Sequence, residues 1–271
     1  MSSKIPVSAV LITRDAEPYL DHVLEPLAVC DEIIVLDSGS TDRTREIAAD
    51  RGAHWAEFPF DGFGSQKRRA VAMARHDWVL SVDADEILDD EAVEGVSAID
   101  WPSTDLLRSW RIRRRTFIGD REIRHGHWAN ERPVRLFNRV VTNVSTDIVH
   151  ETVRPTSSVD VLPGCLLHFS YRDLSEVIRL DYHRLKAVRY RGDGRRAGGG
   201  RLALRAAWAG FHSYFLRRGF LEGGAGVVIA LAAAVNASMG LAMASEPEPA
   251  KARAVHRRLR PVASGRLPKT A

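Results

Sequence analysis

A short apolar run that ends in carboxylates is the part of the sequence best suited to chemistry. Residues 78–82 read WVLSV, and Asp83, Asp85 and Glu86 follow at once. Residues two apart on an extended chain point the same way, so the carboxylates of Asp83 and Asp85 can converge. Hard oxygen ligands with open positions suit Mg²⁺ or Mn²⁺, and such an ion would neutralise charge on a departing diphosphate. The spacing therefore predicts a divalent-cation site at Asp83 and Asp85.

The same acids have a structural interpretation. Acidic residues are favoured at helix N-termini, so residues 83–86 could merely open the next helix. However, the following segment ILDDEAVEGV already carries Asp89 and Asp90 as caps. A D-x-D pair is common by chance, and of the two interpretations we favour the metal site.

A glycine-containing loop precedes a basic helix start. Gly62 and Gly64 are followed by Gln66, Lys67 and Arg68. Small residues let backbone approach a phosphate, and a helix N-terminus adds a favourable dipole. The pattern predicts that Lys67 contacts a diphosphate, with ordinary surface basics as the rival interpretation.

Histidines suggest further sites. His125 and His127 in RHGHW have no third metal ligand spaced nearby, so we favour a sugar-stacking or packing surface that includes Trp128. His168 in LLHFSY is either a further metal ligand or a core histidine with satisfied hydrogen bonds, and the second is favoured.

Strand and helix patterns alternate over the first 83 residues. Apolar runs at 7–13, 32–37, 54–58 and 78–83 are separated by helical segments, the first beginning near Pro18. This alternation predicts a parallel sheet covered on both faces. Ligands bind outside the carboxyl ends of such strands, where Asp37 and Asp83 both lie. Shorter strands at 106–119, 121–128, 132–138, 158–164 and 165–171 predict a mixed extension of the sheet.

The rest of the chain is helical and basic. Helices are expected at 172–192, 201–218 and 221–244, with a flexible break at 193–200 and a disordered tail from 245 to 271. Net charge is +4, and residues 171–220 hold twelve Lys or Arg against four Asp or Glu. Such asymmetry suggests an anionic partner: a membrane surface, a phosphorylated glycan or nucleic acid.

Two features bear on the compartment. Cys30 and Cys165 are the only cysteines, and their distant spacing favours a reducing compartment. The N-terminus resembles a first strand rather than a signal peptide.

Residues 223–245 carry no charge over 23 residues, enough to span a bilayer. Their Gly and Ala content and symmetric basic flanks favour a helix lying in the interface over a core or dimer helix or a true span.

Several motifs together resemble family 2 glycosyltransferases. These are VSAVLITRD, DEIIVLDSGSTDRTREIA, PFDGFGSQKRRA and WVLSVDADE, in the order and spacing of that family. RPVRLFN, VHE and LLHFSYRDL further resemble its bacterial branch of lipopolysaccharide inner-core glucosyltransferases, over about residues 7–226. The resemblance implies a nucleotide-diphospho-sugar transferase (GT-A) fold: α/β, with a mostly parallel sheet, a mixed extension and C-terminal helices.

The resemblance also implies roles for individual residues. It implies a nucleotide-sugar donor, a divalent cation (Mg²⁺ or Mn²⁺) and an inverting transfer. The donor would be held by Thr13, Arg14, Asp15, Asp37, Ser38, Gln66, Lys67, Asp83 and Ala84. Asp37 would meet the uracil or ribose, with a turn-forming Asp as the alternative. His127, Trp128 and His150 are candidates for acceptor contacts.

An inverting transfer needs a base to deprotonate the acceptor hydroxyl. The candidates are Asp120, Glu122, Glu131, Asp147 and Glu151. We favour Glu151 because the resemblance implies an acceptor-side acid late in the sheet extension, although the usual family motif around the base is not reproduced. A solvent-exposed strand Glu is the alternative.

The sequence thus predicts an enzyme in three regions. Residues 1–170 would form the catalytic domain, with a nucleotide half to about 100 and an acceptor half after it; 171–244 would contact the membrane, and 245–271 would be the tail. The enzyme would lie on the inner face of the cytoplasmic membrane and transfer glucose from UDP-glucose to a lipid-linked core glycan. Rivals are a polyprenyl-phosphate sugar synthase and a non-catalytic protein that binds membrane or anionic polymer. We expect no nucleic-acid partner.

Overall fold

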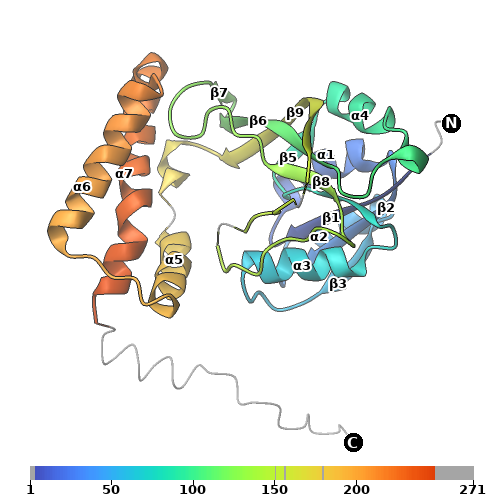
Figure 1. Ribbon diagram of the computed structural model, residues 1–271, viewed down its shortest axis with the longest axis horizontal. Helices are drawn as coiled ribbons and strands as arrows, with labels where there is room; N and C mark the ends of the chain where they lie inside the picture. Colours follow the sequence, from blue (N-terminus) through green and yellow to red (C-terminus); the bar gives the residue numbers. More distant parts are fainter. Residues whose placement is uncertain (1–3, 150, 156, 179, 248–271) are drawn as a thin grey trace, which may run out of the picture.

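The computed structural model describes residues 4–149, 151–155, 157–178 and 180–247, and in this part of the chain nine strands form one sheet (Figure 1). The first four strands are β1 (Ile5–Thr13), β2 (Cys30–Asp37), β3 (His54–Glu57) and β4 (Trp78–Ser81). They are parallel and lie in the order β3-β2-β1-β4. The predicted parallel half is confirmed.

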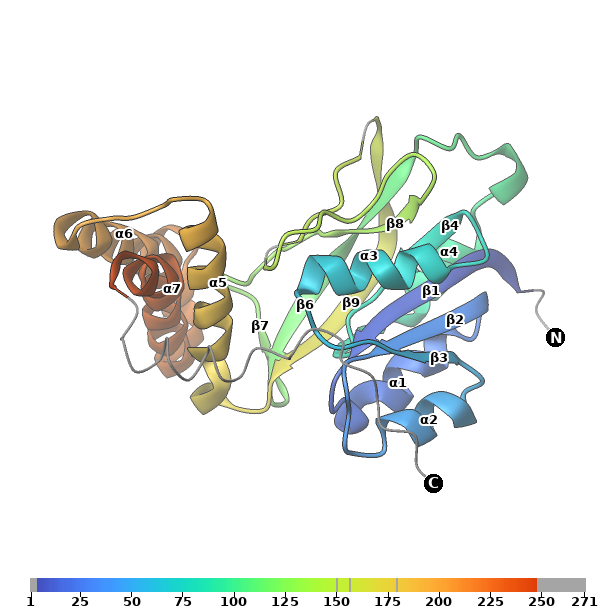
Figure 2. The same cartoon turned by 90° about the horizontal axis from the view of Figure 1, so that it is seen from below.

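Helices cover both faces of these strands because alternate strand residues point to opposite sides. Val7, Ala9 and Leu11 of β1 pack in one core with α1 (Glu17–Leu27) and α4 (Asp90–Ser97). Val10 packs in a second core with α3 (Phe63–Met73). Figure 2 shows α3 on one side of the sheet, with α1 and α2 (Thr44–Asp50) on the other.

The sheet continues as the predicted mixed extension. β8 (Val134–Asn138) pairs antiparallel with β4, β6 (Ser109–Ile118) pairs with β8, and β9 (Val159–Tyr171) runs parallel to β6. β7 (Arg121–Ile123) pairs antiparallel with β6, and β5 (Glu86–Leu88) pairs antiparallel with β9. The short helix η1 (Trp101–Ser103) precedes β6.

Three strand predictions in this extension were wrong. Val159–Tyr171 form one 13-residue strand, β9, rather than the two predicted at 158–164 and 165–171. The strand from 121 ends at Ile123, and RHGHW is a loop. β5 was missed because three residues carry too little periodicity to be recognised.

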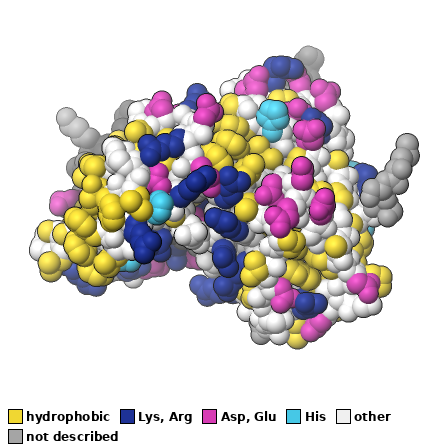
Figure 3. All heavy atoms as spheres, turned by 90° about the horizontal axis from the view of Figure 1, so that it is seen from above, with side chains coloured by type: hydrophobic (Ala, Val, Ile, Leu, Met, Phe, Trp, Pro, Cys, Tyr) yellow, Lys and Arg dark blue, Asp and Glu magenta, His cyan; other side chains and the backbone are white. Residues whose placement is uncertain are grey.

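The C-terminal helices form the other end of the molecule. They are η2 (Leu174–Val177), α5 (Leu180–Gly192), α6 (Gly199–Phe211), the π-helical turn η3 (His212–Leu216), η4 (Gly219–Glu222) and α7 (Gly223–Ser245). The helix expected from residue 172 is divided, since Asp173 caps η2 and α5 starts afterwards. Figure 3 shows hydrophobic side chains gathered at this end. The three-region division stays a prediction, and the expected tail from 248 onward lies outside the described residues.

By length and composition, Gly219–Ser245 is the one helical stretch within the described residues that could cross a membrane. However, 39% of its most apolar window is buried inside the protein, and core helices pass the same test. Cys30 and Cys165 are both buried and free.

Gly64 is packed tightly against the segment that leads to Glu151. A Cβ at Gly64 would lie 2.3 Å from the Ser145 carbonyl oxygen and 2.5 Å from that of Asp147. We expect Gly64→Ala to displace this segment and to lower the free energy of unfolding by about 2 kcal/mol in denaturant titrations. Gly192→Ala is the control, because its added Cβ meets no described atom within 4 Å and should be nearly neutral. Equal stability of both variants would contradict this packing role.

Candidate active site

A pocket of about 1020 Å³ opens at the carboxyl ends of β1 and β4. β9, the segment before β8, and the η2–α5 region complete its walls. Among the described residues, nine of the predicted site residues line it: Thr13, Arg14, Asp15, Ser38, Lys67, Asp83, Ala84, Asp85 and Glu151. Asp37, Gln66, His127 and Trp128 lie elsewhere, and His150 is outside the described residues.

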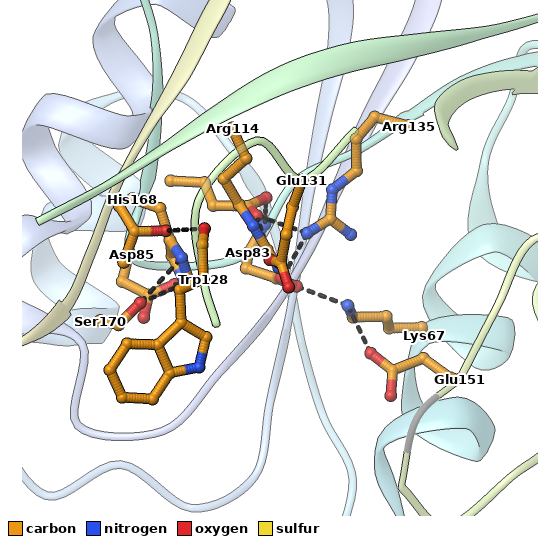
Figure 4. Close-up of polar contacts among 12 residues, drawn as sticks. Lys67, Asp83, Asp85, Arg114, Trp128, Glu131, Arg135, Glu151, His168 and Ser170 are labelled. Atoms are coloured by element: carbon orange, nitrogen blue, oxygen red, sulfur yellow. Dashed lines mark hydrogen bonds and ion pairs between the residues drawn. The ribbon is translucent and has the colours of Figure 1, made fainter. Parts of the chain in front are cut away.

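Asp83 is held between two cations in this pocket (Figure 4). Its Oδ1 lies 2.5 Å from Lys67 Nζ, and its Oδ2 lies 2.5 Å from Arg135 Nη2. Burial by itself raises the pKa of Asp83, but the charges of Arg135 and Lys67 outweigh it and hold the pKa well below its usual range. Asp83 is therefore ionised and already paired on both oxygens.

Lys67 links Asp83 to Glu151. It projects from the first turns of α3, its side chain is 7% exposed, and its Nζ lies 2.7 Å from Glu151 Oε1. Burial lowers the pKa of Lys67, but the carboxylates of Asp83 and Glu151 more than reverse this and leave it raised. The rival interpretation of Lys67 as an ordinary surface residue was wrong.

A second layer of charge behind Asp83 was missed from the sequence. Glu86 is fully buried, and its carboxylate contacts Arg135 at 2.5 Å and Arg114 at 3.1 Å. Arg114 also pairs with Glu131, and Glu86 accepts the Asp83 backbone N–H. Burial lowers the pKa of Arg135, but Asp83 and Glu86 together raise it above its ordinary value. One signal in the sequence could have revealed this buried charge: Arg135 stands within the otherwise apolar strand segment VRLFN.

Removing this buried cation is expected to be costly. Arg135→Met leaves Glu86 with Arg114 alone and Asp83 with Lys67 alone, and uncompensated buried charge destabilises strongly. We expect a loss of about 3 kcal/mol in the free energy of unfolding, measured by denaturant titration. Arg45→Met is the control, since its pair with Glu57 is exposed and should contribute less than about 1 kcal/mol. A loss for Arg135→Met no greater than for the control would contradict the network's structural role.

Asp85 faces His168 across the pocket wall. Asp85 Oδ1 and His168 Nε2 are 3.5 Å apart, longer than a good hydrogen bond. Ser170 Oγ lies 2.7 Å from His168 Nδ1 and 2.9 Å from Nε2 (Figure 4). The preference for His168 as a core histidine was wrong, because the side chain lines the pocket.

The donor chemistry at Asp85 and His168 fits a divalent cation. A carboxylate oxygen and an imidazole nitrogen both suit Mn²⁺, and the Ser170 hydroxyl, within hydrogen-bond distance of both ring nitrogens, helps to hold the imidazole in place. Asp83 fits less well than predicted, since both of its oxygens are paired with cations. Within the described residues, no group of three or more His, Cys, Asp or Glu side chains is arranged to hold a metal.

Two predicted nucleotide residues instead build the turn after β2. Asp37 is 1% exposed, and its carboxylate accepts from the Thr13 hydroxyl and the Gly39 and Ser40 N–H groups. Its contacts match the turn-forming alternative, and Ser38 is the residue of this turn that lines the pocket. Gln66 is buried and donates to the Ser38 hydroxyl and the Phe58 carbonyl. Both residues therefore position the pocket wall, and their contact with a nucleotide stays a prediction.

Of the five acids considered as a base, Glu151 is the one that lines the pocket among the described residues. Three others are engaged elsewhere: Glu122 pairs with Arg115 and Arg124, Glu131 with Arg114, and Asp147 with Arg189. The Glu151 side chain is 18% exposed, so the alternative of a solvent-exposed strand Glu was wrong.

Two of the predicted acceptor residues, His127 and Trp128, lie outside the pocket lining. Trp128 packs on Tyr171 with ring centroids 5.2 Å apart, next to an apolar cluster that includes Ile229 of α7. The His127 carbonyl accepts from Arg217. The packing alternative stated for RHGHW therefore matches the contacts of Trp128.

Comparisons with known proteins agree on one family. The model described as "Glycosyl transferase family 2" matches residues 8–153. The chain is 31% identical over 196 residues to the lipopolysaccharide core biosynthesis glycosyltransferase LpsC of Rhizobium meliloti, covering 69% of this chain and 72% of that protein. It is 28% identical over 236 residues to an uncharacterized glycosyltransferase of Rickettsia typhi, covering 82% and 80%.

Two solved structures show some likeness to the chain. Glucosyl-3-phosphoglycerate synthase of Mycobacterium tuberculosis, in complex with Mn²⁺, UDP and glucosyl-3-phosphoglycerate, matches with a TM-score of 0.32 and 26% identity. That match covers 42% of this chain and 44% of the synthase, so the chain spans less than half of the synthase. TarS of S. aureus matches with a TM-score of 0.47 and 18% identity, covering 86% of this chain and 81% of TarS.

Proposed function

The chain belongs to glycosyl transferase family 2 and is a glycosyltransferase with the GT-A type of α/β fold, and on this premise we propose that it transfers glucose from UDP-glucose, with inversion, to a lipid-anchored lipopolysaccharide core or a related glycan. The name of the R. meliloti relative supports the choice of acceptor class. The motifs that resemble inner-core glucosyltransferases support the choice of sugar. Membership of the family counts against the non-catalytic rival.

One observation carries the proposal: Asp83, Asp85, Lys67 and Glu151 converge from separate segments on one pocket at the strand ends. Ligands of open parallel sheets bind at this edge. The pocket is large enough for a nucleotide sugar together with part of an acceptor, since ligand sites commonly measure ~300–1,000 Å³.

The donor would lie along the β1 and β4 ends. Thr13, Arg14, Asp15 and Ser38 line the side where the nucleoside is expected. Lys67 is held by Asp83 and Glu151, so its ammonium is fixed in place to meet a diphosphate without losing freedom on binding. Arg135 keeps Asp83 ionised, which maintains Lys67 in this position.

A divalent cation, Mn²⁺ or Mg²⁺, would be held by Asp85 and His168, and it would neutralise the diphosphate as a leaving group. Asp83 would support this site from the next layer, because its oxygens are engaged by Lys67 and Arg135. Ser170 would fix the orientation of the His168 ring.

Glu151 is the base in this proposal. Its carboxylate would take the proton from the acceptor hydroxyl while the hydroxyl oxygen bonds to the anomeric carbon and the diphosphate departs with the bonding electrons. Attack from the face opposite the diphosphate gives inversion. The contact with the Lys67 ammonium keeps the Glu151 carboxylate oriented.

Product analysis by mass spectrometry tests the function. The purified chain would be incubated with Mn²⁺, either UDP-glucose or GDP-mannose, and either deacylated core oligosaccharide or polyprenyl phosphate. We expect a hexose added to the core oligosaccharide from UDP-glucose, with the anomeric configuration opposite to that of the donor. Transfer to polyprenyl phosphate alone would establish the lipid-phosphate rival. Retained configuration would exclude Glu151 as the base of a single displacement.

A further inference from the structure

One face of α6 and η3 is apolar and open. Leu204, Trp208, Phe211 and Phe215 are 74%, 61%, 47% and 54% exposed. Their spacing of four, three and four residues places them on one side of a helix. Exposed large apolar side chains scattered singly need no explanation, whereas a contiguous set marks an interaction surface. These four residues are called the α6 face below.

The α6 face continues into an aromatic cluster. Ring centroids are 6.1 Å apart between Trp208 and Phe211 and 5.0 Å between Phe211 and Phe215. Tyr214 lies 5.1 Å from Phe215 and 6.3 Å from Phe220, which is 47% exposed. The apolar surface therefore extends from α6 to η4. Figure 3 shows hydrophobic side chains over this end of the molecule, with Lys and Arg side chains beside them.

The charge around the α6 face has one sign. Residues 194–221 contain six arginines and no Asp or Glu. Arg201 lies in the first turn of α6, and Arg217 and Arg218 follow η3, so basic groups lie at both ends of the face. Trp and Phe with flanking Arg are the composition of helices that bind anionic bilayers. A second copy of the chain is a poorer occupant, because a two-fold interface would bring the same arginines together.

α7 supports the α6 face instead of forming the contact itself. Ile229, Ala232 and Ala233 of α7 are buried, and a Cβ at Gly210 of α6 would lie 3.4 Å from the Ala230 carbonyl. Lys186 of α5 donates to the Asn236 carbonyl on another side of α7. The exposed residues of α7 include Val227 and Leu231, which can only extend the margin of the apolar surface. This differs from the expectation that residues 223–245 lie in the interface.

We propose that the α6 face docks on the surface of an anionic lipid bilayer, with its aromatic side chains inserted and the arginines among the headgroups. The same C-terminal region supplies Glu176, Ile178 and Tyr182 to the wall of the active-site pocket. Docking therefore brings the pocket close to the membrane, where a lipid-anchored acceptor resides. This purpose rests on the proposed function, but the docking itself requires no sugar transfer.

Vesicle flotation with the full chain tests the docking. The vesicles would be phosphatidylcholine alone or mixed with phosphatidylglycerol. We expect binding to the mixed vesicles, and Trp208→Ser with Phe211→Ser should lower the partition coefficient roughly 100-fold, because two aromatic groups no longer leave water. Val140→Ser with Val161→Ser is the matched control, since both residues are exposed on the sheet extension and should leave binding unchanged. Arg196→Glu with Arg201→Glu should weaken binding to mixed vesicles, and Arg45→Glu should not.

Brominated lipids give a second measurement that does not depend on the serine variants folding. Quenching of tryptophan fluorescence by mixed vesicles should be strong in the wild type and largely lost in Trp208→Phe. Unchanged flotation in the Trp208→Ser, Phe211→Ser variant, or equal quenching in Trp208→Phe, would overturn the proposal. A wild-type dimer that the serine variant converts to a monomer would also overturn it, since the α6 face would then join two copies. Loss of product formation with vesicle binding intact would instead count against the proposed function alone.

Discussion

Asp85→Ala is expected to abolish cation-dependent binding of the donor and to lower kcat/KM by at least ~1,000-fold. The alanine removes the carboxylate that faces His168 in the pocket, and a single imidazole holds a divalent ion weakly. Calorimetry of UDP-glucose binding with Mn²⁺ or with EDTA measures the effect directly. The wild type should bind more tightly with Mn²⁺, and the variant should bind equally weakly in both solutions.

Two further variants isolate the role of Asp85. His168→Ala should reduce the Mn²⁺-dependent part of binding in the same direction, because it removes the other donor atom. Glu176→Gln is the matched control, since Glu176 lines the same pocket near Arg172, and Mn²⁺-dependent binding should persist in this variant. Mn²⁺-dependent donor binding that survives in Asp85→Ala would exclude Asp85 as a ligand. If Mn²⁺-dependent donor binding were lost in Asp83→Asn but kept in Asp85→Ala, Asp83 would be the cation ligand instead.

Much of the donor side of the pocket is predictable from the sequence. Parallel strands align their carboxyl ends at one edge of a sheet, so a polar residue directly after an apolar run falls at the binding edge. Asp83 follows such a run directly, Asp85 lies two residues further on, and both line the pocket. Thr13 also lines it, but its place beside the nucleotide was predicted from the resemblance to family 2 glycosyltransferases. The helix after PFDGFG likewise brings Lys67 to the same edge. These placements depend on local patterns and one topological rule.

The partners of these residues are not predictable in the same way. Arg135 reaches Asp83 because β8 inserts antiparallel beside β4, a pairing across more than fifty residues of sequence. Periodicity shows that residues 132–138 form a strand but does not reveal its neighbour. The pairing of Asp85 with His168 has the same origin, since β9 returns to lie beside β5. Because such pairings are long-range, the sequence predicted a metal site at Asp83 and Asp85 without showing that the oxygens of Asp83 are paired with Lys67 and Arg135.

Asp37 shows a different limit. Its position at a strand end is shared with Thr13 and Asp83, but the glycine and serine that follow turn their N–H groups back toward its carboxylate. A short side chain before a tight turn is captured by local backbone donors, as Asp commonly is. The α6 face is a third case: helical spacing predicts a helix near residues 201–218, but only packing against α7 determines which side stays open.

Glu151→Gln is expected to lower kcat roughly 1,000-fold while leaving the dissociation constant for UDP-glucose nearly unchanged, because a glutamine cannot accept the acceptor's proton in the transition state. Glutamine has almost the shape of glutamate and can still accept a hydrogen bond from Lys67, so the donor site should keep its geometry. Steady-state kinetics combined with donor calorimetry measures both quantities.

The pH profile separates a base from a residue that only positions others. A general base acts only in its unprotonated form, so kcat of the wild type should fall on the acid side, and this limb should be absent in Glu151→Gln. If Glu151 merely held Lys67 in place, the glutamine variant would largely keep both kcat and the acid limb, because glutamine still accepts the hydrogen bond from Lys67. Lys67→Met provides the complementary result: it removes the ammonium shared by Asp83 and Glu151, so donor binding should weaken while the acid limb persists. A Glu151→Gln variant with unchanged kcat would transfer the role of base to another acid that lines the pocket, of which Glu176 and Asp15 are the candidates among the described residues.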